Sequence, residues 1–381
     1  MQKNIVLFIA FLDILGFAIF IPALPEIASY FGISIAYTWL ILTVYAFFSF
    51  LFTPILGQLS DKFGRKKVLF LSVIGTFFWN LLMYFSPNFW IFLVWRMIDG
   101  ATWWNISVIQ SILSDISKNK QERTKNMAYI WALFWIWFII GPFLWWFLLK
   151  FWINILLLVL VILSIVEIWI LFLFKETIKE KHSEKISYNP LWKMFFYLKN
   201  KDTKYLLFSF FFVIFAVSFY QLMLPVYLNV NFWVSGEYAG YIMWFAGIVG
   251  TLNQIFFLKK FWLNKFTHKK LIFIANIWLS LCMFWMAFIW NLYLFIWFFL
   301  LNVIFMWVFR PVYTSEILEN VKKTGEILGV ISSLRSLTMI FTPILSSILI
   351  ESWINIFIVS MIFVLVSVYI IYIKYWYDKN S

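Results

Sequence analysis

Apolar runs of about twenty residues recur along this chain from one end to the other, separated by short polar breaks. A helix needs roughly 20 apolar residues to cross a bilayer, whereas strands of a membrane barrel alternate over about ten residues. A soluble domain cannot hide a chain of 381 residues that is 64% hydrophobic, because polar residues must cover its surface. We therefore predict an all-α membrane protein.

The polar breaks divide the chain into twelve predicted membrane spans. They cover residues 5–29, 38–60, 67–86, 89–113, 126–149, 152–174, 205–230, 236–258, 270–290, 291–313, 325–350 and 353–374. The longest polar stretch follows the sixth span. We therefore expect an N-terminal six-helix half over 1–174, a basic cytoplasmic linker over 175–204 and a C-terminal six-helix half over 205–381. Two six-helix halves are a recurrent transporter design.

The lysines and arginines indicate the orientation. Of the 30, only Lys150 falls on the side opposite the linker, and Arg96, Arg310 and Arg335 lie inside spans. Positive residues remain on the cytoplasmic side, so we expect both termini in the cytoplasm. The net charge of +13 orients the protein and faces anionic lipid, and it requires no nucleic-acid partner.

The loop between the second and third predicted spans reads GQLSDKFGRKK over residues 57–67. It resembles the signature loop of the major facilitator superfamily at every defined position. The resemblance implies a gating loop of Gly57, Asp61, Gly64 and Arg65, joined by Asp115, the acid at the cytoplasmic end of span four. The alternative is that the basic residues of this loop only enforce topology, and both roles are compatible.

Several shorter segments resemble the tetracycline–proton antiporters and their drug-exporter relatives. They are LDILG at 12–16, IPALP at 21–25, RMIDG at 96–100, Gly141-Pro142, NPL at 189–191 and Gln221. The resemblance implies the major facilitator fold, a bacterial inner-membrane location, and proton-driven export of small molecules or drugs. Those exporters carry further membrane acids in spans three and nine. This chain has Trp79 and Asn80 near the first place and no acid in the second, so tetracycline is a doubtful substrate.

Tryptophan is unusually common and glycine unusually rare, with 24 and 13 residues. The exporters' span-five motif is G-P-x-x-G-G. Here Gly141 and Pro142 match it, while Trp145 and Trp146 stand where the last two glycines belong. Our hypothesis is that many of these codons are UGA, read as glycine in the source bacterium, since glycine at 131, 135, 137 and 145 would restore close helix packing. Trp90, at a predicted interface, is expected to be genuine. The alternative is a naturally aromatic-rich bundle.

Charged residues inside the predicted spans are the candidates for proton coupling. A charge at mid-membrane costs about 2.5–3.5 kcal/mol or more, so such residues usually face a cavity and function there. Burial disfavours an ionised carboxyl group, which suits Asp13 in span one to carrying a proton. Arg96 and Asp99 lie three apart on one face of span four and could modulate Asp13, or merely pair for packing. Glu167 ranks behind them, because span six is usually peripheral in this superfamily.

Polar residues in other spans are possible substrate contacts. They are Asn105, Gln110, Tyr220, Gln221, Gln254 and Arg335. The alternative for single polar residues in a helix bundle is hydrogen bonding between helices. We expect no metal and no cofactor, because His182 and His268 have no second ligand at metal spacing and no ATP-binding loop occurs.

The preferred interpretation is a proton-coupled exporter that works by alternating access. One alternative is a proton symporter that imports a small nutrient, and a second is a non-transporting membrane receptor or assembly protein. The chain has no paired catalytic constellation near one membrane face, so we expect no enzymatic activity. The expected partners are a small-molecule substrate, protons and the lipid bilayer, and we expect a monomer.

Overall fold

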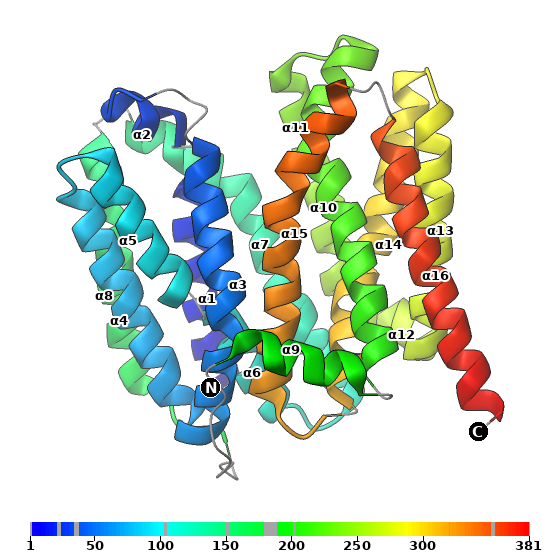
Figure 1. Cartoon of the computed structure of the whole chain (residues 1–381), viewed down its shortest axis with the longest axis horizontal. Coiled ribbons are helices and arrows are strands. Elements are labelled where there is room, and N and C mark those ends of the chain that lie inside the picture. Colours follow the sequence, from blue (N-terminus) through cyan, green and yellow to red (C-terminus); the bar gives the residue numbers. More distant parts are fainter. Residues whose placement is uncertain are drawn as a thin grey trace. The chain divides into compact units, whose positions relative to one another are not determined.

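The computed structural model describes residues 2–20, 24–33, 38–102, 105–149, 153–178, 189–200, 203–319, 321–351 and 355–380. Within these ranges every regular element is a helix (Figure 1). The helices are α1 (Gln2–Phe20), α2 (Leu24–Tyr30), α3 (Thr38–Phe63), α4 (Arg65–Tyr84), α5 (Phe89–Thr102), α6 (Asn105–Asp115), α7 (Lys120–Leu149), α8 (Ile153–Leu173), α9 (Pro190–Lys199), α10 (Lys204–Phe232), α11 (Gly236–Leu252), a π-helical segment (Asn253–Trp262), α12 (Leu263–Lys265), α13 (His268–Phe288), α14 (Leu292–Glu319), α15 (Thr324–Glu351) and α16 (Ile356–Asn380). His182 lies outside the described residues.

Eight helices within the described ranges are long and apolar enough to cross a membrane. Helix α8 illustrates how they are built. It exposes Leu158, Ile162 and Trp169, whereas Leu160 and Glu167 are buried. An apolar face that remains exposed on a folded chain suits contact with lipid, because hydrocarbon carries no penalty for apolar surface. The predicted all-α membrane fold is confirmed.

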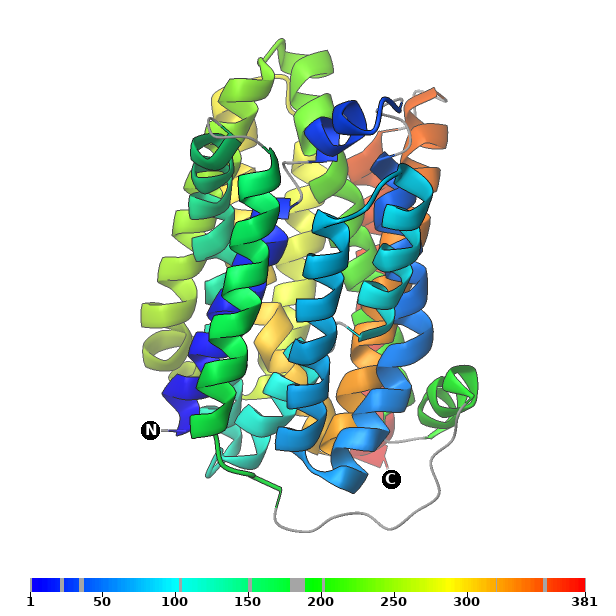
Figure 2. The same ribbon diagram turned by 90° about the vertical axis from the view of Figure 1, so that its left-hand side faces the viewer.

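The helices pack into two compact units. The first contains Met1–Lys118, Ile136–Met194 and Lys322–Leu337, and the second contains Asn119–Trp135, Phe195–Val321 and Thr338–Ser381. In the first, α8 packs against α1 and α4 (Figure 2), and α3 packs against α5. In the second, α16 packs against α10 and α13, and α13 against α14. Helices α7, α9 and α15 therefore contribute residues to both units. The predicted sequence boundaries of the two halves stay a prediction.

Some predicted spans differ from the helices in detail. The first, 5–29, corresponds to α1 followed by the short α2, in a stretch where prolines at 22 and 25 remove backbone donors. The fourth, 89–113, corresponds to α5 and α6. The eighth, 236–258, runs through α11 into the π-helical segment, which the apolar pattern does not distinguish from an α-helix.

Three residues, Gly32, Gly64 and Trp233, adopt backbone conformations that favour glycine. Gly64, with φ of +110°, forms the turn between α3 and α4 and accounts for the second glycine of the signature loop. Trp233, with φ of +55°, ends α10 and is the one non-glycine residue in this region among the residues described. A left-handed conformation costs a side chain about 1–2 kcal/mol, and helices commonly place glycine here. The backbone thus favours glycine at a position where the sequence gives tryptophan.

Candidate functional site

A small cavity lies among α1, α3, α4, α5 and α8 of the first unit. It is lined by the predicted coupling residues Asp13, Arg96 and Asp99, together with Tyr45 and Glu167. The cavity volume is about 40 Å³. A water molecule needs roughly 10–15 Å³ by such a measure, and a drug-sized ligand needs roughly 300–1,000 Å³. This cavity therefore has room for a few waters and not for a drug.

The predicted coupling residues are brought together and buried. Asp13, Arg96 and Asp99 expose 5%, 3% and 3% of their surface. Arg96 donates from Nη1 to Asp99 Oδ2 at 2.5 Å, the i, i+3 pair expected on one helix face. The Arg96 guanidinium also lies 4.3 Å from the ring centre of Phe20 and 4.4 Å from that of Tyr45. Aromatic faces stabilise a cation where water is scarce, which helps to keep this arginine charged.

The polar groups of α4 and α8 that border the cavity are engaged with each other. Asn80 donates from Nδ2 to Ser164 Oγ at 2.8 Å and to the Leu160 carbonyl at 3.2 Å. Trp79 stacks edge-on against Phe20 and is also buried. Asn80 thus joins α4 to α8 at the place where the antiporter resemblance implies an acid.

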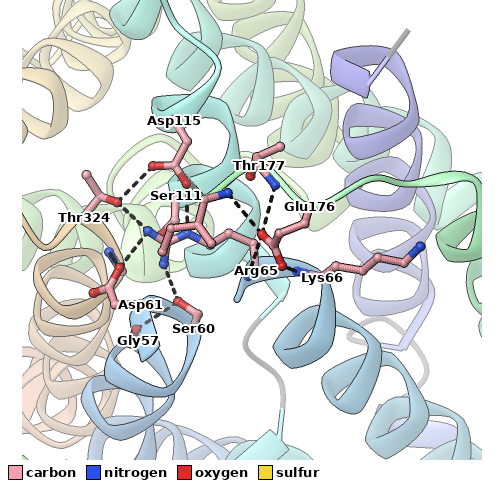
Figure 3. A network of polar contacts seen from close by, with 12 residues as sticks. Gly57, Ser60, Asp61, Arg65, Lys66, Ser111, Asp115, Glu176, Thr177 and Thr324 are labelled. Carbon is pink, nitrogen blue, oxygen red and sulfur yellow. Dashed lines mark hydrogen bonds and ion pairs between the residues drawn. The ribbon is translucent and has the colours of Figure 1, made fainter. Parts of the chain in front are cut away.

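The signature loop forms a second, charged cluster around Arg65, which is 1% exposed (Figure 3). Its guanidinium donates from Nη2 to Asp61 Oδ1 at 2.7 Å and from Nε to Asp115 Oδ2 at 3.0 Å. Further donations reach Ser60 Oγ at 2.6 Å and Thr324 Oγ1 at 2.7 Å. Arg65 therefore connects α3, α4, α6 and the start of α15, and the predicted meeting of Asp61, Arg65 and Asp115 occurs. We call this cluster the latch.

Asp61 also caps the first turn of α15. Its Oδ1 accepts from the Gly325 N–H at 3.0 Å, and its Oδ2 accepts from the Glu326 N–H at 2.7 Å. The first backbone N–H groups of a helix have no partners within the helix, and the helix dipole favours a negative charge there. One carboxylate therefore satisfies two amides and one guanidinium.

Glu176 borders the latch, and burial affects the protonation of Asp115 within it. Glu176, just after α8, accepts from the Arg65 N–H at 3.0 Å and the Lys66 N–H at 3.1 Å, and so caps α4 in the same way. Burial raises the pKa of the Asp115 carboxyl group above its ordinary value, and the guanidinium of Arg65 opposes that rise. Asp115 is therefore easier to protonate than a surface aspartate.

Glycines allow α3 and the start of α15 to touch through their backbones. A Cβ on Gly57 would lie 2.2 Å from the Gly325 carbonyl oxygen, and one on Gly325 would lie 2.6 Å from the Gly57 carbonyl oxygen. Farther along, Ser333 donates to the Phe50 carbonyl at 2.6 Å. Any side chain at the two glycines would hold the helices apart, so the first glycine of the signature is a packing requirement of the latch.

The residues predicted to contact substrate lie in different places. Gln110 is buried in α6, and Arg335 lies half-buried on the part of α15 that belongs to the first unit. In the second unit, Tyr220 donates to Asn302 Oδ1 at 2.7 Å, and Gln254 donates to the Trp307 carbonyl at 3.2 Å. Gln221 faces the Met306 sulfur from the same helix as Tyr220, with Nε2 at 3.5 Å. These hydrogen bonds match the alternative interpretation, packing between helices, for Tyr220 and Gln254.

Some predicted positions have no described side chain. They are Asn105 in α6 and the antiporter motif of Gly141, Pro142, Trp145 and Trp146 in α7. For the motif, the structure gives only that all four belong to the helix Lys120–Leu149. The crowding that tryptophan would cause at 145 and 146 stays a prediction.

The sequence did not reveal a third charged cluster, in the second unit. Lys120 at the start of α7 binds Glu316 at 2.7 Å, and Arg123 binds Glu319 at 2.6 Å, both acids lying near the end of α14. Arg123 also donates to the Ser315 carbonyl at 2.9 Å. Basic residues at a helix start and acids at a helix end oppose the helix dipole, and this mismatch is the signal that could have indicated a pairing between the two.

A sequence model described as the Major Facilitator Superfamily matches residues 6–261, more than half of the chain. The chain belongs to the Major Facilitator Superfamily. Among curated relatives, the class H tetracycline resistance protein of Pasteurella multocida is 35% identical over 156 residues, which is 38% of this chain and 37% of the relative. The class B protein of Escherichia coli is 33% identical over 151 residues, 37% of this chain and 36% of that protein. These matches span well under half of the relatives' length.

Solved structures share the fold over nearly the whole chain. The human organic anion transporter MFSD10 (TETRAN) superimposes with a TM-score of 0.85 at 19% identity, covering 97% of this chain and 98% of that one. A bacterial homologue of the iron transporter ferroportin, in an outward-facing state with soaked iron, gives 0.81 at 13% identity, covering 98% and 99%. At these identities the likeness establishes the fold alone.

Proposed function

We propose that this member of the superfamily is a proton-coupled exporter of small molecules or drugs that works by alternating access. It would act as a monomer in the bacterial inner membrane, with both termini in the cytoplasm. The relatives named as tetracycline resistance proteins support export, and the buried carboxyl group of Asp13 in a cavity sized for water supports proton coupling. The latch supports a gated cycle, because its ion pairs must break whenever the start of α15 moves from the α3–α4 turn.

The observation that carries the proposal is the position of Asp13. Asp13 is 5% exposed and lines a cavity with room for a few waters, beside the ion pair of Arg96 and Asp99. A carboxylate in such surroundings is stabilised by taking up a proton, and releasing the proton requires access to water. A conformational cycle that solvates Asp13 on one side and then on the other would couple proton movement to export.

Asp13→Asn tests the proposal, because asparagine is nearly isosteric and never ionises. Everted vesicles would be loaded with fluorescent drugs, including ethidium, under an imposed pH gradient. We expect proton-driven accumulation to be lost in Asp13→Asn while exchange down a drug gradient persists. Glu122→Gln, an isosteric change in the first turn of α7 at a residue that does not line the cavity, is the matched control. A pH-dependent drug gradient in Asp13→Asn vesicles would refute the assignment of Asp13.

A further inference from the structure

Helix α9 turns large aromatic side chains outward. Trp192, Phe195 and Phe196 expose 64%, 53% and 54% of their surface, and Lys199 is also exposed. The last three lie three, four and seven residues after Trp192, so all four share one face of the helix. We call these four residues the aromatic face of α9. The face stays apolar if residue 192 is glycine, because the two phenylalanines remain.

The opposite face of α9 is held by the protein. Met194 and Tyr197 expose only 9% and 4% of their surface. The Thr203 hydroxyl donates to the Tyr197 carbonyl at 2.7 Å, and the Lys204 N–H donates to the Asn200 carbonyl at 2.9 Å. These contacts fix the end of α9 to the first turn of α10 and leave the aromatic face turned away from the protein.

The attachment to α10 places the aromatic face at a membrane boundary. The part of α10 that is long and apolar enough to cross a membrane begins at Lys204, and residues 200–203 alone separate it from the end of α9. Helix α9 runs across the direction of α10 instead of continuing it (Figure 1). Large aromatic side chains favour this level of a bilayer, where an amphipathic helix buries its apolar face between headgroups and acyl chains.

The charges around α9 match an anionic lipid surface. Residues 193–204 contain four lysines and one acid, and Lys199 lies on the aromatic face itself. A lysine close to an anionic membrane strengthens binding by about fivefold. A second copy of this chain would fit less well, because a symmetric contact would set the same lysines against each other.

We propose that the aromatic face of α9 binds the bilayer surface. Phe195 and Phe196 lie among the upper acyl chains, and the neighbouring lysines contact the phosphates of anionic phospholipids. Bound in this way, α9 ties the start of α10 to the headgroup layer. None of the described residues that line the cavity of Asp13 belongs to α9, and the inference depends neither on proton coupling nor on the substrate.

A spin label on the full chain measures the depth of the aromatic face. Cys282, the single cysteine, is buried, so Cys282→Ala provides a background in which Phe195→Cys carries one nitroxide. The protein is placed in lipid discs of an equal mixture of phosphatidylcholine and anionic phosphatidylglycerol. We expect the label to collide more often with oxygen, which dissolves in lipid, than with a water-soluble nickel complex. Lys322→Cys, at an exposed lysine between α14 and α15, is the control and should show the opposite order.

Hydrogen–deuterium exchange of the α9 amides tests the choice of lipid. We expect slower exchange in the mixed discs than in discs of phosphatidylcholine alone, because a bound helix opens less often. Lys199→Gln should reduce this difference by about fivefold. Lys270→Gln, an equal change of charge at an exposed residue near the start of α13, should keep it. Salt at 1 M, where charges are screened beyond about 3 Å, should also reduce the difference.

Four results would overturn the proposal. One is a label at 195 that the nickel complex reaches as readily as the label at 322. Another is equal exchange of the α9 amides in the two kinds of disc, which would leave an apolar contact without preference for anionic lipid. The third is magnetic coupling between the labels at 195 of two copies, which would make the face a dimer interface. The last is a lowered unfolding temperature of Lys199→Gln in discs without anionic lipid, which would make Lys199 a structural residue.

Discussion

Asp61→Asn should loosen the latch by an amount that the structure allows to be worked out. Asp61 is 3% exposed and accepts from two amides of α15 and from Arg65. Asparagine keeps one acceptor oxygen but turns an N–H₂ group toward a former donor. One buried amide is then left without an acceptor, at about 1–3 kcal/mol, and Arg65 keeps only Asp115 as a charged partner. We expect a loss of about 3 kcal/mol, or roughly a hundredfold in the opening equilibrium.

Hydrogen–deuterium exchange of the first turn of α15 measures this opening directly. The amides of Gly325 and Glu326 should lose about a hundredfold of their protection in Asp61→Asn, because their acceptor is weakened or removed. Asp115→Asn is the matched control, since Asp115 contacts the Arg65 guanidinium and the Thr324 hydroxyl but no α15 amide in the latch. Equal protection of these amides in wild type and Asp61→Asn would refute the capping role. Proton-driven drug accumulation should fall in parallel, with insertion and topology unchanged.

Three further outcomes are expected. Gly57→Ala should reduce the free energy of unfolding by about 1–3 kcal/mol and lower the unfolding temperature, because its Cβ would lie 2.2 Å from a carbonyl oxygen. A Cβ at Gly240 would meet nothing within 4 Å, so Gly240→Ala should leave the unfolding temperature unchanged. Trp233→Gly should raise the free energy of unfolding by about 1 kcal/mol, whereas Trp290→Gly, at an exposed position, should not. The codon for residue 233 should be UGA, and a UGG codon would count against recoding at this position. Because burial raises the pKa of Asp115, lowering the pH should neutralise this carboxylate and increase amide exchange in the first turn of α4, where its partner Arg65 lies. Asp115→Asn should remove this pH dependence of exchange. The same pH dependence in Asp115→Asn would exclude Asp115 as the titrating group.

The fold and half of the latch could be predicted because their determinants are side chains. Run length and hydrophobicity indicate the helices. The resemblance of the loop at 57–67 to the superfamily signature implies that Asp61 and Arg65 meet Asp115. The other half could not be predicted, because the groups that Asp61 binds on α15 are backbone amides. Every residue except proline has such an amide, so the amino-acid sequence does not mark the two that are used.

The burial of Glu167 could not be predicted for a related reason. The family places its helix at the periphery, and a helix against lipid has one buried face as well as one exposed face. The spacing of Leu160, Ser164, Glu167 and Leu171 already placed the acid on one stripe. Which stripe is buried depends on packing against α1 and α4, which the sequence alone does not give.

The way in which Asp61 holds α15 has a consequence for how the two sides of the latch tolerate mutation. On the α15 side, the two amide donors survive any substitution at 326 except proline, and the limit at 325 is set by steric space. On the loop side, the acceptor is a single carboxylate of one length, so almost every change at Asp61 removes it. During evolution the residues on the α15 side can therefore be replaced by many others, whereas Asp61 on the loop must be kept. A latch built in this way would be recognisable in distant sequences from one of its two partners only.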